Sequence, residues 1–347
     1  MKHKSIGIKD IAKHAGVSTG PVDKVLNNRG GVSKATRQRI LQAIKELEYT
    51  PNILASRLKS AKEYTIAVLL PEATDEVPYW EEHHRGLQDV VSDIAVFGLA
   101  IEIFSFNQND NISFSKQISI ILSKSYDGVF MVPVFEDHTK EFVSKLKERK
   151  IPVIFFDTQI PSLEVPFIGQ HTEDSGYLAA EILYKCLPSL SDILIVTLTK
   201  KDDNHMHFKS RENGFRKFFK NKERSILNYK NNSDDEETIK SDLKKILLKS
   251  PEIKGIFVTN GIHRIASILP PSNEYTVIGY DLIQQNIEHL NNGIIDFLIS
   301  QRPYSQANSG IRLFYDILIK KETVNSKIYL PMDIVMKSNL KYYCPST

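Results

Sequence analysis

The sequence predicts an all-α helix-turn-helix head followed by a larger α/β body with two lobes and parallel sheets. The first 49 residues contain three short segments in which apolar residues recur at helical spacing. From Tyr64 onward, apolar runs typical of buried parallel strands alternate with helical patterns. This alternation occurs twice in succession, so we expect two similar lobes.

The composition is that of an ordinary globular protein, with 41% hydrophobic and 25% charged residues in a chain of 347. The basic N-terminus lacks the apolar stretch of a secretory signal, and no apolar run approaches the roughly 20 residues of a membrane span. Two cysteines, Cys186 and Cys344, are too few for a disulfide framework or a zinc cluster. We therefore expect a cytoplasmic protein with incidental thiols and no membrane partner.

Charge is unevenly distributed along the chain. Residues 1–62 hold 13 Lys and Arg against 4 Asp and Glu, a balance of +9, which leaves −6 on the remaining 285 residues. A small basic head on an acidic body indicates that the head meets a polyanion.

The first predicted helix has an apolar face formed by Ile8, Ile11, Ala12 and Ala15. Gly16 follows at the place where many helices end in a left-handed residue. These features predict a short amphipathic helix that stops at Gly16.

Two further helices follow, with Ser18 and Ser33 at their predicted N-caps. Their predicted buried positions are Val22, Val25 and Leu26 in the second helix and Ile40, Ala43, Ile44 and Leu47 in the third. Three short helices with a tight first turn form a helix-turn-helix domain.

The turn reads Gly16-Val-Ser18-Thr-Gly20, which also matches the G-x-S-x-G pattern of a hydrolase nucleophile elbow. That elbow needs a buried strand before the serine, whereas an amphipathic helix precedes Ser18. We therefore interpret Ser18 as a helix cap. Pro21 is compatible with this, because first-turn N–H groups have no partner within the helix.

The first turn of such a second helix is the part that enters the major groove of DNA. Thr19 can reach a base edge or a phosphate, Gly20 offers no side chain, and Lys24 can reach guanine or phosphate. We expect sparse base readout from this turn.

The head resembles the DNA-binding domain of the LacI/GalR family of bacterial transcription regulators. The matching motifs are D-I-A-x-x-A-G-V-S, V-x-x-V-L-N, V-S-x-x-T-R and Y-x-P-N, all at the family spacing. Gly20, Pro21, Asp23 and Lys24 depart from the usual residues and leave the operator sequence open. The DNA contacts that the resemblance implies are Thr19, Gly20, Lys24, Asn28, Arg29, Ser33 and Thr36.

The segment after Pro51 resembles the hinge helix that forms in this family on specific DNA, paired with its twin from a second subunit. In "ILASRLKSAK", Ala55 and Leu58 match the residues that enter the minor groove, with the leucine as a wedge. The alternative is a plain linker helix in which Leu58 packs on its own domain.

The body is predicted to alternate strands and helices. The predicted strands cover residues 65–71, 100–106, 126–134, 152–157, 167–169, 192–198, 254–260 and 275–281. The predicted helices cover residues 79–96, 113–125, 137–149, 173–187, 207–220 and 236–249.

Polar residues follow several predicted strands, at the edge where open parallel sheets bind ligands. They are Asp157, Asn260 and Asp281. The chain lacks the G-x-G-x-x-G and G-x-x-x-x-G-K-[ST] motifs, so we expect no nucleotide cofactor. No nucleophile–base pair or metal cluster accompanies these residues, which favours binding over catalysis.

Over residues 64–340 the body resembles the type I periplasmic sugar-binding fold that LacI/GalR regulators use as a sensor, particularly its ribose-binding branch. The resemblance implies that an aromatic pair covers a sugar ring while carboxylates, amides and an arginine bind its hydroxyls. The matching residues are Tyr79, Trp80, Asp157, Arg211, Asn260, Asp281 and Gln301.

Each of these residues has a structural alternative. Trp80 is also suited to the core, Asp157 and Asp281 to helix caps, and Arg211 to pairing with a surface acid. Thr158 replaces an arginine frequent in the family, and Gly261 replaces its usual aspartate, so the effector can differ from common family sugars.

His83, His84, His205 and His207 raise the question of a metal site. Adjacent residues on a helix point to different faces, and no cysteine or clustered acid completes a site. We interpret these as surface histidines, without a metal.

The sequence thus predicts a homodimeric transcription regulator that acts as a repressor, and not an enzyme. We expect a helix-turn-helix domain at residues 1–49, a hinge at 50–62 and an effector-binding, dimerising body at 63–347. Its partners would be a pseudo-palindromic operator and a small sugar-like effector. The alternative is a solute-binding protein of a transport system, which the basic head and the missing signal peptide oppose.

Overall fold

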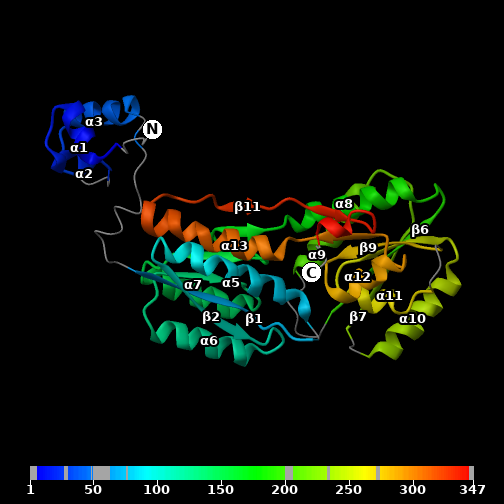
Figure 1. The fold of residues 1–347 in the computed structure, drawn as a ribbon. Coiled ribbons are helices and arrows are strands. Elements are labelled where there is room, and N and C mark those ends of the chain that lie inside the picture. Colours follow the sequence, from blue (N-terminus) through cyan, green and yellow to red (C-terminus); the bar gives the residue numbers. More distant parts are fainter. Residues whose placement is uncertain are drawn as a thin grey trace. The chain divides into compact units, whose positions relative to one another are not determined.

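The computed structural model describes residues 6–26, 30–47, 49, 63–75, 77–199, 206–232, 235–270 and 274–343. The chain forms two compact units, a head that ends at Glu63 and a body that begins at Tyr64 (Figure 1).

The described part of the head contains the three predicted helices, α1 (Ile8–Ala15), α2 (Thr19–Leu26) and α3 (Lys34–Glu46). Gly16 ends α1 in the left-handed conformation, with φ 63°. Pro21 lies in the first turn of α2, and the Ser33 hydroxyl caps α3 by accepting the Thr36 N–H at 3.2 Å. A small core joins the helices, formed by Ile11, Ala12, Ala15, Val22, Val25, Ile40 and Ala43.

The first lobe of the body contains a parallel six-stranded sheet in the order β11-β5-β4-β3-β1-β2. Its strands are β1 (Tyr64–Pro71), β2 (Leu99–Phe106), β3 (Gly128–Met131), β4 (Val153–Phe156), β5 (Phe167–Gly169) and β11 (Lys327–Tyr329). Its helices are η1 (Pro78–Trp80), α5 (Glu81–Ala95), α6 (Asn111–Ser123), α7 (Glu136–Glu148), α13 (Pro303–Phe314) and the π-helical η2 (Tyr315–Lys320). One apolar cluster packs α6 and α7 on one face of the sheet, and another packs α5 and α13 on the opposite face.

The second lobe contains a six-stranded sheet in the order β12-β10-β9-β8-β6-β7. Its strands are β6 (Asp192–Leu198), β7 (Ile226–Asn231), β8 (Ile253–Val258), β9 (Thr276–Tyr280), β10 (Phe297–Ser300) and β12 (Asp333–Val335). Its helices are α8 (Thr172–Cys186), α9 (Met206–Phe219), α10 (Glu236–Lys249), α11 (Ile262–Ala266), α12 (Gln284–Asn291) and η3 (Leu340–Tyr342). Helices α8 and α9 cover one face, while α10, α11 and α12 cover the other.

The two lobes have the same strand order, position by position, which confirms the prediction of two similar lobes. The sheets are parallel except for the edge strand β12, which pairs antiparallel with β10. The chain crosses between the lobes three times, from β5 to α8, from β10 to α13 and from β11 to β12 (Figure 1). These crossovers place the carboxyl ends of both sheets at one cleft.

Candidate functional site

A cavity of about 270 Å³ lies within the body and is lined by residues of both lobes. All seven residues predicted to bind an effector line it: Tyr79, Trp80, Asp157, Arg211, Asn260, Asp281 and Gln301. Further residues line the cavity that the sequence patterns did not indicate, and they include Gln108, Asn109, Thr172, Thr199, His207, Phe208 and Arg264.

The aromatic pair of the first lobe lies on η1, directly before α5. The rings of Tyr79 and Trp80 meet edge to face, with centroids 5.0 Å apart at 71°. The Trp80 indole N–H donates to Oε1 of Gln108 at 2.9 Å. Trp80 is 5% exposed and packs in the apolar cluster below α5, so the core role and the cavity-lining role apply together.

His83 corrects one prediction, because it is fully buried and not a surface residue. Its ring packs 4.9 Å from that of Trp80 and 5.6 Å from that of Phe156. Burial lowers the pKa of His83 to about 4, so the ring is neutral at physiological pH. His84 is half-buried and lies 3.2 Å from the Pro71 carbonyl oxygen. Within the described ranges, no three His, Cys, Asp or Glu side chains are grouped as a metal site requires.

Asp157 and Asp281 occupy matching places in the two lobes, directly after β4 and β9. Both have a left-handed backbone, with φ 63° and 78°. Neither is a helix cap: no helix starts after Asp157 before β5, and α12 begins after Ile283 without a side-chain cap. The capping alternative is therefore wrong for both residues.

The carboxylate of Asp157 accepts two hydroxyl hydrogen bonds. Tyr79 donates to Oδ1 at 2.5 Å, and Thr158 donates to Oδ2 at 2.9 Å. Burial and the charges of Asp157 and Asp281 raise the pKa of the Tyr79 hydroxyl well above its usual value. Tyr79 therefore keeps its proton and remains a donor at neutral pH.

In the second lobe, Arg211 lies on α9 with 3% exposure, which excludes the surface ion pair considered as its alternative. Its guanidinium lies 3.7 Å from the centre of the Tyr280 ring and donates to the Thr259 carbonyl oxygen at 2.6 Å. A second N–H donates to Oε1 of Gln301 at 2.8 Å, and Gln301 in turn donates to Oδ1 of Asp281 at 2.7 Å. Gln301 thus connects the arginine to the carboxylate.

Burial raises the pKa of Asp281 to about 6, although Arg211 and the Gln301 hydrogen bond favour the charged form. The charge of Asp157 adds to the rise. Hydrogen bonds from the hydroxyls of a ligand would favour the charged form of Asp281, which burial disfavours.

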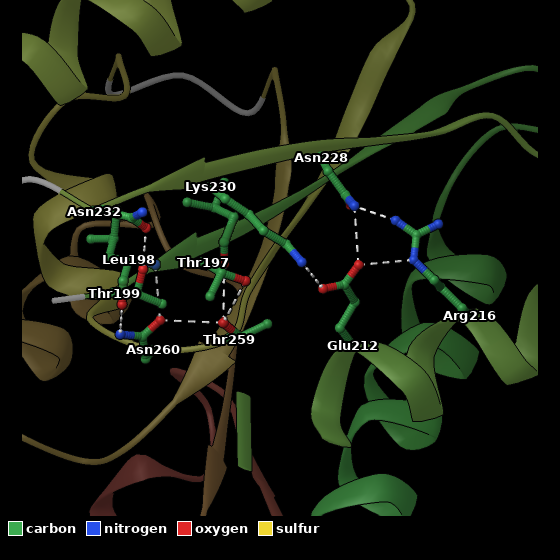
Figure 2. A network of polar contacts seen from close by, with 11 residues as sticks. Thr197, Leu198, Thr199, Glu212, Arg216, Asn228, Lys230, Asn232, Thr259 and Asn260 are labelled. Carbon is green, nitrogen blue, oxygen red and sulfur yellow. Dashed lines mark hydrogen bonds and ion pairs between the residues drawn. The ribbon is translucent and has the colours of Figure 1, made fainter. Parts of the chain in front are cut away.

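Asn260 lines the cavity, but its amide is already occupied by the neighbouring strand (Figure 2). Its Nδ2 donates to the Leu198 carbonyl oxygen at 2.5 Å, and its Oδ1 accepts the Leu198 N–H at 3.1 Å. The Thr259 hydroxyl also donates to Oδ1, at 3.2 Å. Asn260 therefore ties the end of β8 to the end of β6.

The same view shows how α9 is attached to β7 (Figure 2). Glu212 is 7% exposed and accepts Nε of Arg216 and Nδ2 of Asn228, each at 3.0 Å. Lys230 of β7 lies 2.7 Å from its other oxygen. This ion-pair network secures the helix that carries Arg211.

In the head, Thr19, Gly20, Lys24 and Ser33 are exposed and Thr36 is half-buried. The predicted contacts Asn28, Arg29, Ala55 and Leu58 lie outside the described residues. Within the described residues, no helix is long and apolar enough to cross a membrane.

Comparison with known proteins assigns both units. Residues 66–322 match the periplasmic binding protein domain, and residues 7–52 match the lacI family of bacterial regulatory proteins. The chain is 24% identical to the ribose operon repressor of Halalkalibacterium halodurans in an alignment 347 residues long, which covers 96% of this chain and 97% of that protein. It is 31% identical to the transcriptional regulator RegA of Clostridium acetobutylicum over 158 residues, 44% of this chain and 43% of RegA.

Solved structures show the same relationship. A solved structure from Bacteroides fragilis, described as that of a LacI transcriptional regulator, is 29% identical to this chain in sequence. Its TM-score is 0.72, and the match covers 82% of this chain and 100% of that one. A solute binding protein of Burkholderia graminis in complex with D-arabinose has the same fold at 18% identity, with a TM-score of 0.69 over 82% and 99% of the two chains. The chain belongs to the family of the periplasmic binding protein domain and carries a DNA-binding head of the lacI family, and it is a DNA-binding transcription regulator.

Proposed function

We propose that this regulator binds a small sugar or sugar derivative in the cavity of its body, and that binding changes its affinity for an operator. The observation that supports this most is the arrangement of the cavity. Two strand-end carboxylates, a buried arginine and an aromatic pair line one space of about 270 Å³. That is just below the roughly 300–1,000 Å³ usual for small-molecule pockets, which favours a monosaccharide-sized effector.

Each lining residue has a role that suits a polyol. Asp157 and Asp281 accept hydrogen bonds from hydroxyls, and Gln301, which accepts a hydrogen bond from Arg211, donates to Asp281 and so orients its carboxylate. Tyr79 and Trp80 cover the apolar C–H face of a ring. Asn260 acts mainly on the scaffold, because both ends of its amide are bonded to Leu198.

We further propose the division of labour along the chain. Residues 1–49 read the operator, 50–62 form a hinge, and 63–347 bind the effector and dimerise. The DNA contacts are Thr19, Gly20, Lys24, Asn28, Arg29, Ser33 and Thr36, with Ala55 and Leu58 in the minor groove. We expect a homodimer on a pseudo-palindromic operator, because the two half-sites of such an operator match the two-fold symmetry of a dimer. Since the protein would act on chromosomal DNA, we propose that it is located in the cytoplasm.

Closure of the lobes around the effector changes the spacing of the two hinges in the dimer. Coupling between the two sites of such a protein is typically about 1–3 kcal/mol, enough to change operator occupancy several-fold. Whether the effector releases or promotes binding depends on which lobe arrangement suits the paired hinges.

The test uses the purified full chain. Melting curves and Trp80 fluorescence are measured with D-ribose, D-arabinose, D-allose, D-galactose, sugar acids and sugar phosphates, and gel shifts on genomic fragments are run with each binder. A sugar that raises the melting temperature and changes the DNA shift supports the proposal. DNA binding that no member of the panel alters contradicts a sugar effector, and sugar binding without DNA binding supports a transport protein instead.

A further inference from the structure

The second and third crossovers between the lobes are joined by one ion pair. Arg302 lies between β10 and α13, and Asp333 is the first residue of β12, just after the third crossover. Nε of Arg302 lies 2.6 Å from Oδ2 of Asp333, and a terminal nitrogen lies 2.7 Å from Oδ1. Both oxygens of the carboxylate are therefore bound by one guanidinium, a geometry that Lys cannot reproduce.

Arg302 has a left-handed backbone, with φ 54°. Such a conformation is costly for a residue other than glycine and persists only where neighbouring contacts impose it. Here its side chain is bound to Asp333 and its N–H donates to the Ser300 hydroxyl at 3.2 Å. Asp333 also pairs with Ser300 in the antiparallel β10–β12 ladder. The ladder therefore fixes the position of Asp333 relative to the turn at Arg302.

This turn sets the direction of Gln301, the preceding residue. The Gln301 carbonyl oxygen accepts Nε2 of the fully buried Gln306 at 2.9 Å. Its side chain connects Arg211 to Asp281 at the wall of the cavity. A continuous series of contacts thus runs from Asp333 through Arg302 and Gln301 to two residues proposed to bind the effector.

We propose that Arg302 and Asp333 are positioning residues for the cavity. Their paired contact holds the crossover in the conformation that places Gln301 between Arg211 and Asp281, and it restrains how far the lobes separate. The effect on effector affinity rests on the proposed function, whereas the restraint on the lobes does not.

The chain contains a matched control for this pair. Arg312 lies 2.6 Å from Asp93, with partly exposed side chains on both sides, but that pair joins α13 to α5 within the first lobe. Arg312→Lys therefore removes the same kind of side chain without touching a crossover. The conservative Arg302→Lys and Asp333→Asn retain the size of the original residues and keep misfolding to a minimum.

In the first measurement, the full chain is titrated with the panel sugar that raises its melting temperature most. Arg302→Lys and Asp333→Asn should each weaken binding by about fivefold or more, because the bidentate geometry is lost, while Arg312→Lys changes it less than about twofold. The double variant should bind no more weakly than the worse single variant, because two partners of one contact are not additive. Wild-type affinity in both single variants overturns the proposal.

A second measurement needs no sugar. Trp80 is the only tryptophan and lines the cavity, so acrylamide quenching of its fluorescence reports access to the cleft. Both crossover variants should be quenched more readily than the wild type and Arg312→Lys, with melting curves confirming that all are folded. If no sugar of the panel binds the wild type, the proposal of a sugar effector fails. The quenching measurement still tests the positioning role of Arg302 and Asp333, and unchanged quenching in both variants overturns that role.

Discussion

The surroundings of Asp281 disfavour the charged form of its carboxyl group. Its pKa is raised to about 6 by burial, so in the folded protein it binds a proton more readily than in the unfolded chain. Stability contributed by that proton is present at low pH and is lost as the pH rises through about 6. The ionised carboxylate is therefore kept at neutral pH at a cost to stability.

We predict that Asp281→Asn raises the melting temperature of the unliganded protein at pH 7.5 and abolishes the sugar response. The shift from 3.8 to about 6 sets an upper bound of about 3 kcal/mol on the gain, reduced because the side chain is only half-buried. Melting curves from pH 4 to 8 check this. A gain that did not shrink toward pH 4, or a mutant that still bound sugar, would contradict the prediction.

We expect a substitution of Asn260 to affect stability more than sugar binding, because both ends of its amide form hydrogen bonds with the main chain of Leu198. Asn260→Ala is predicted to lower stability by about 1–3 kcal/mol, since the Leu198 N–H and carbonyl oxygen lose their partner. Sugar affinity should fall much less than in Arg211→Lys. Denaturant titration and sugar titration of both variants separate these effects. A larger loss of sugar affinity in Asn260→Ala than in Arg211→Lys would indicate that Asn260 contacts the ligand.

The seven residues predicted to bind an effector all line the cavity, but the sequence does not show how they contact one another. The bridge through Gln301 and the hydrogen-bonded amide of Asn260 join residues that lie 20 to 90 positions apart, which no local pattern shows. The burial of His83 was detectable, because His83, Leu87, Val90 and Ile94 form one buried stripe of α5. Treating histidine as a polar residue hid this stripe.

At the scale of elements, the strongest patterns were predicted most accurately. Strand β6 and helix α10 have the predicted bounds, since β6 is a continuous buried apolar run and α10 begins directly after the N-cap Asp235. No element was predicted for β7, β10, β11, β12, α11, α12 or α13. Edge strand β7 is half exposed, β11 and β12 have three residues each, and the buried face of α13 includes Gln306 and Gly310, which mask its apolar stripe.

Helices α8 and α9 approach each other through glycines. A Cβ at Gly176 would lie 1.9 Å from the Arg211 carbonyl oxygen, so Gly176→Ala must push α9 away. We predict a loss of about 1–3 kcal/mol or more in stability together with weaker sugar binding, because α9 carries Arg211. The control is Gly20→Ala, where a Cβ meets nothing within 4 Å and stability should not fall. Sugar binding at wild-type strength in Gly176→Ala would show that Arg211 tolerates movement of α9.

At the scale of the whole molecule, DNA affinity should reside in the basic head. Operator affinity of the full chain is predicted to fall steeply with salt, since Lys and Arg displace phosphate counterions. Residues 63–347 alone, with a balance of −6, should not bind DNA at any salt concentration. Fluorescence anisotropy with labelled operator measures both, and retention of the isolated body on DNA would refute the division.

The hinge gives a second prediction at this scale. Leu58→Ala should weaken specific operator binding several-fold through loss of the minor-groove wedge, while sugar affinity and melting temperature stay close to wild type. Gel shifts on bent and unbent operator fragments test this. Equal affinity and equal bending in the mutant would favour the plain linker helix.

The three crossovers also determine the order in which the protein becomes complete during synthesis. The helices of the head lie within residues 8–46, whereas the first lobe needs α13 and β11, and the second needs β12, all from beyond residue 302. Domains fold as their residues emerge, at about 5–20 residues per second. A nascent chain therefore finishes its DNA-binding helices well before either lobe of its sensor can close, and control by the effector begins only when the last tenth of the chain has been made.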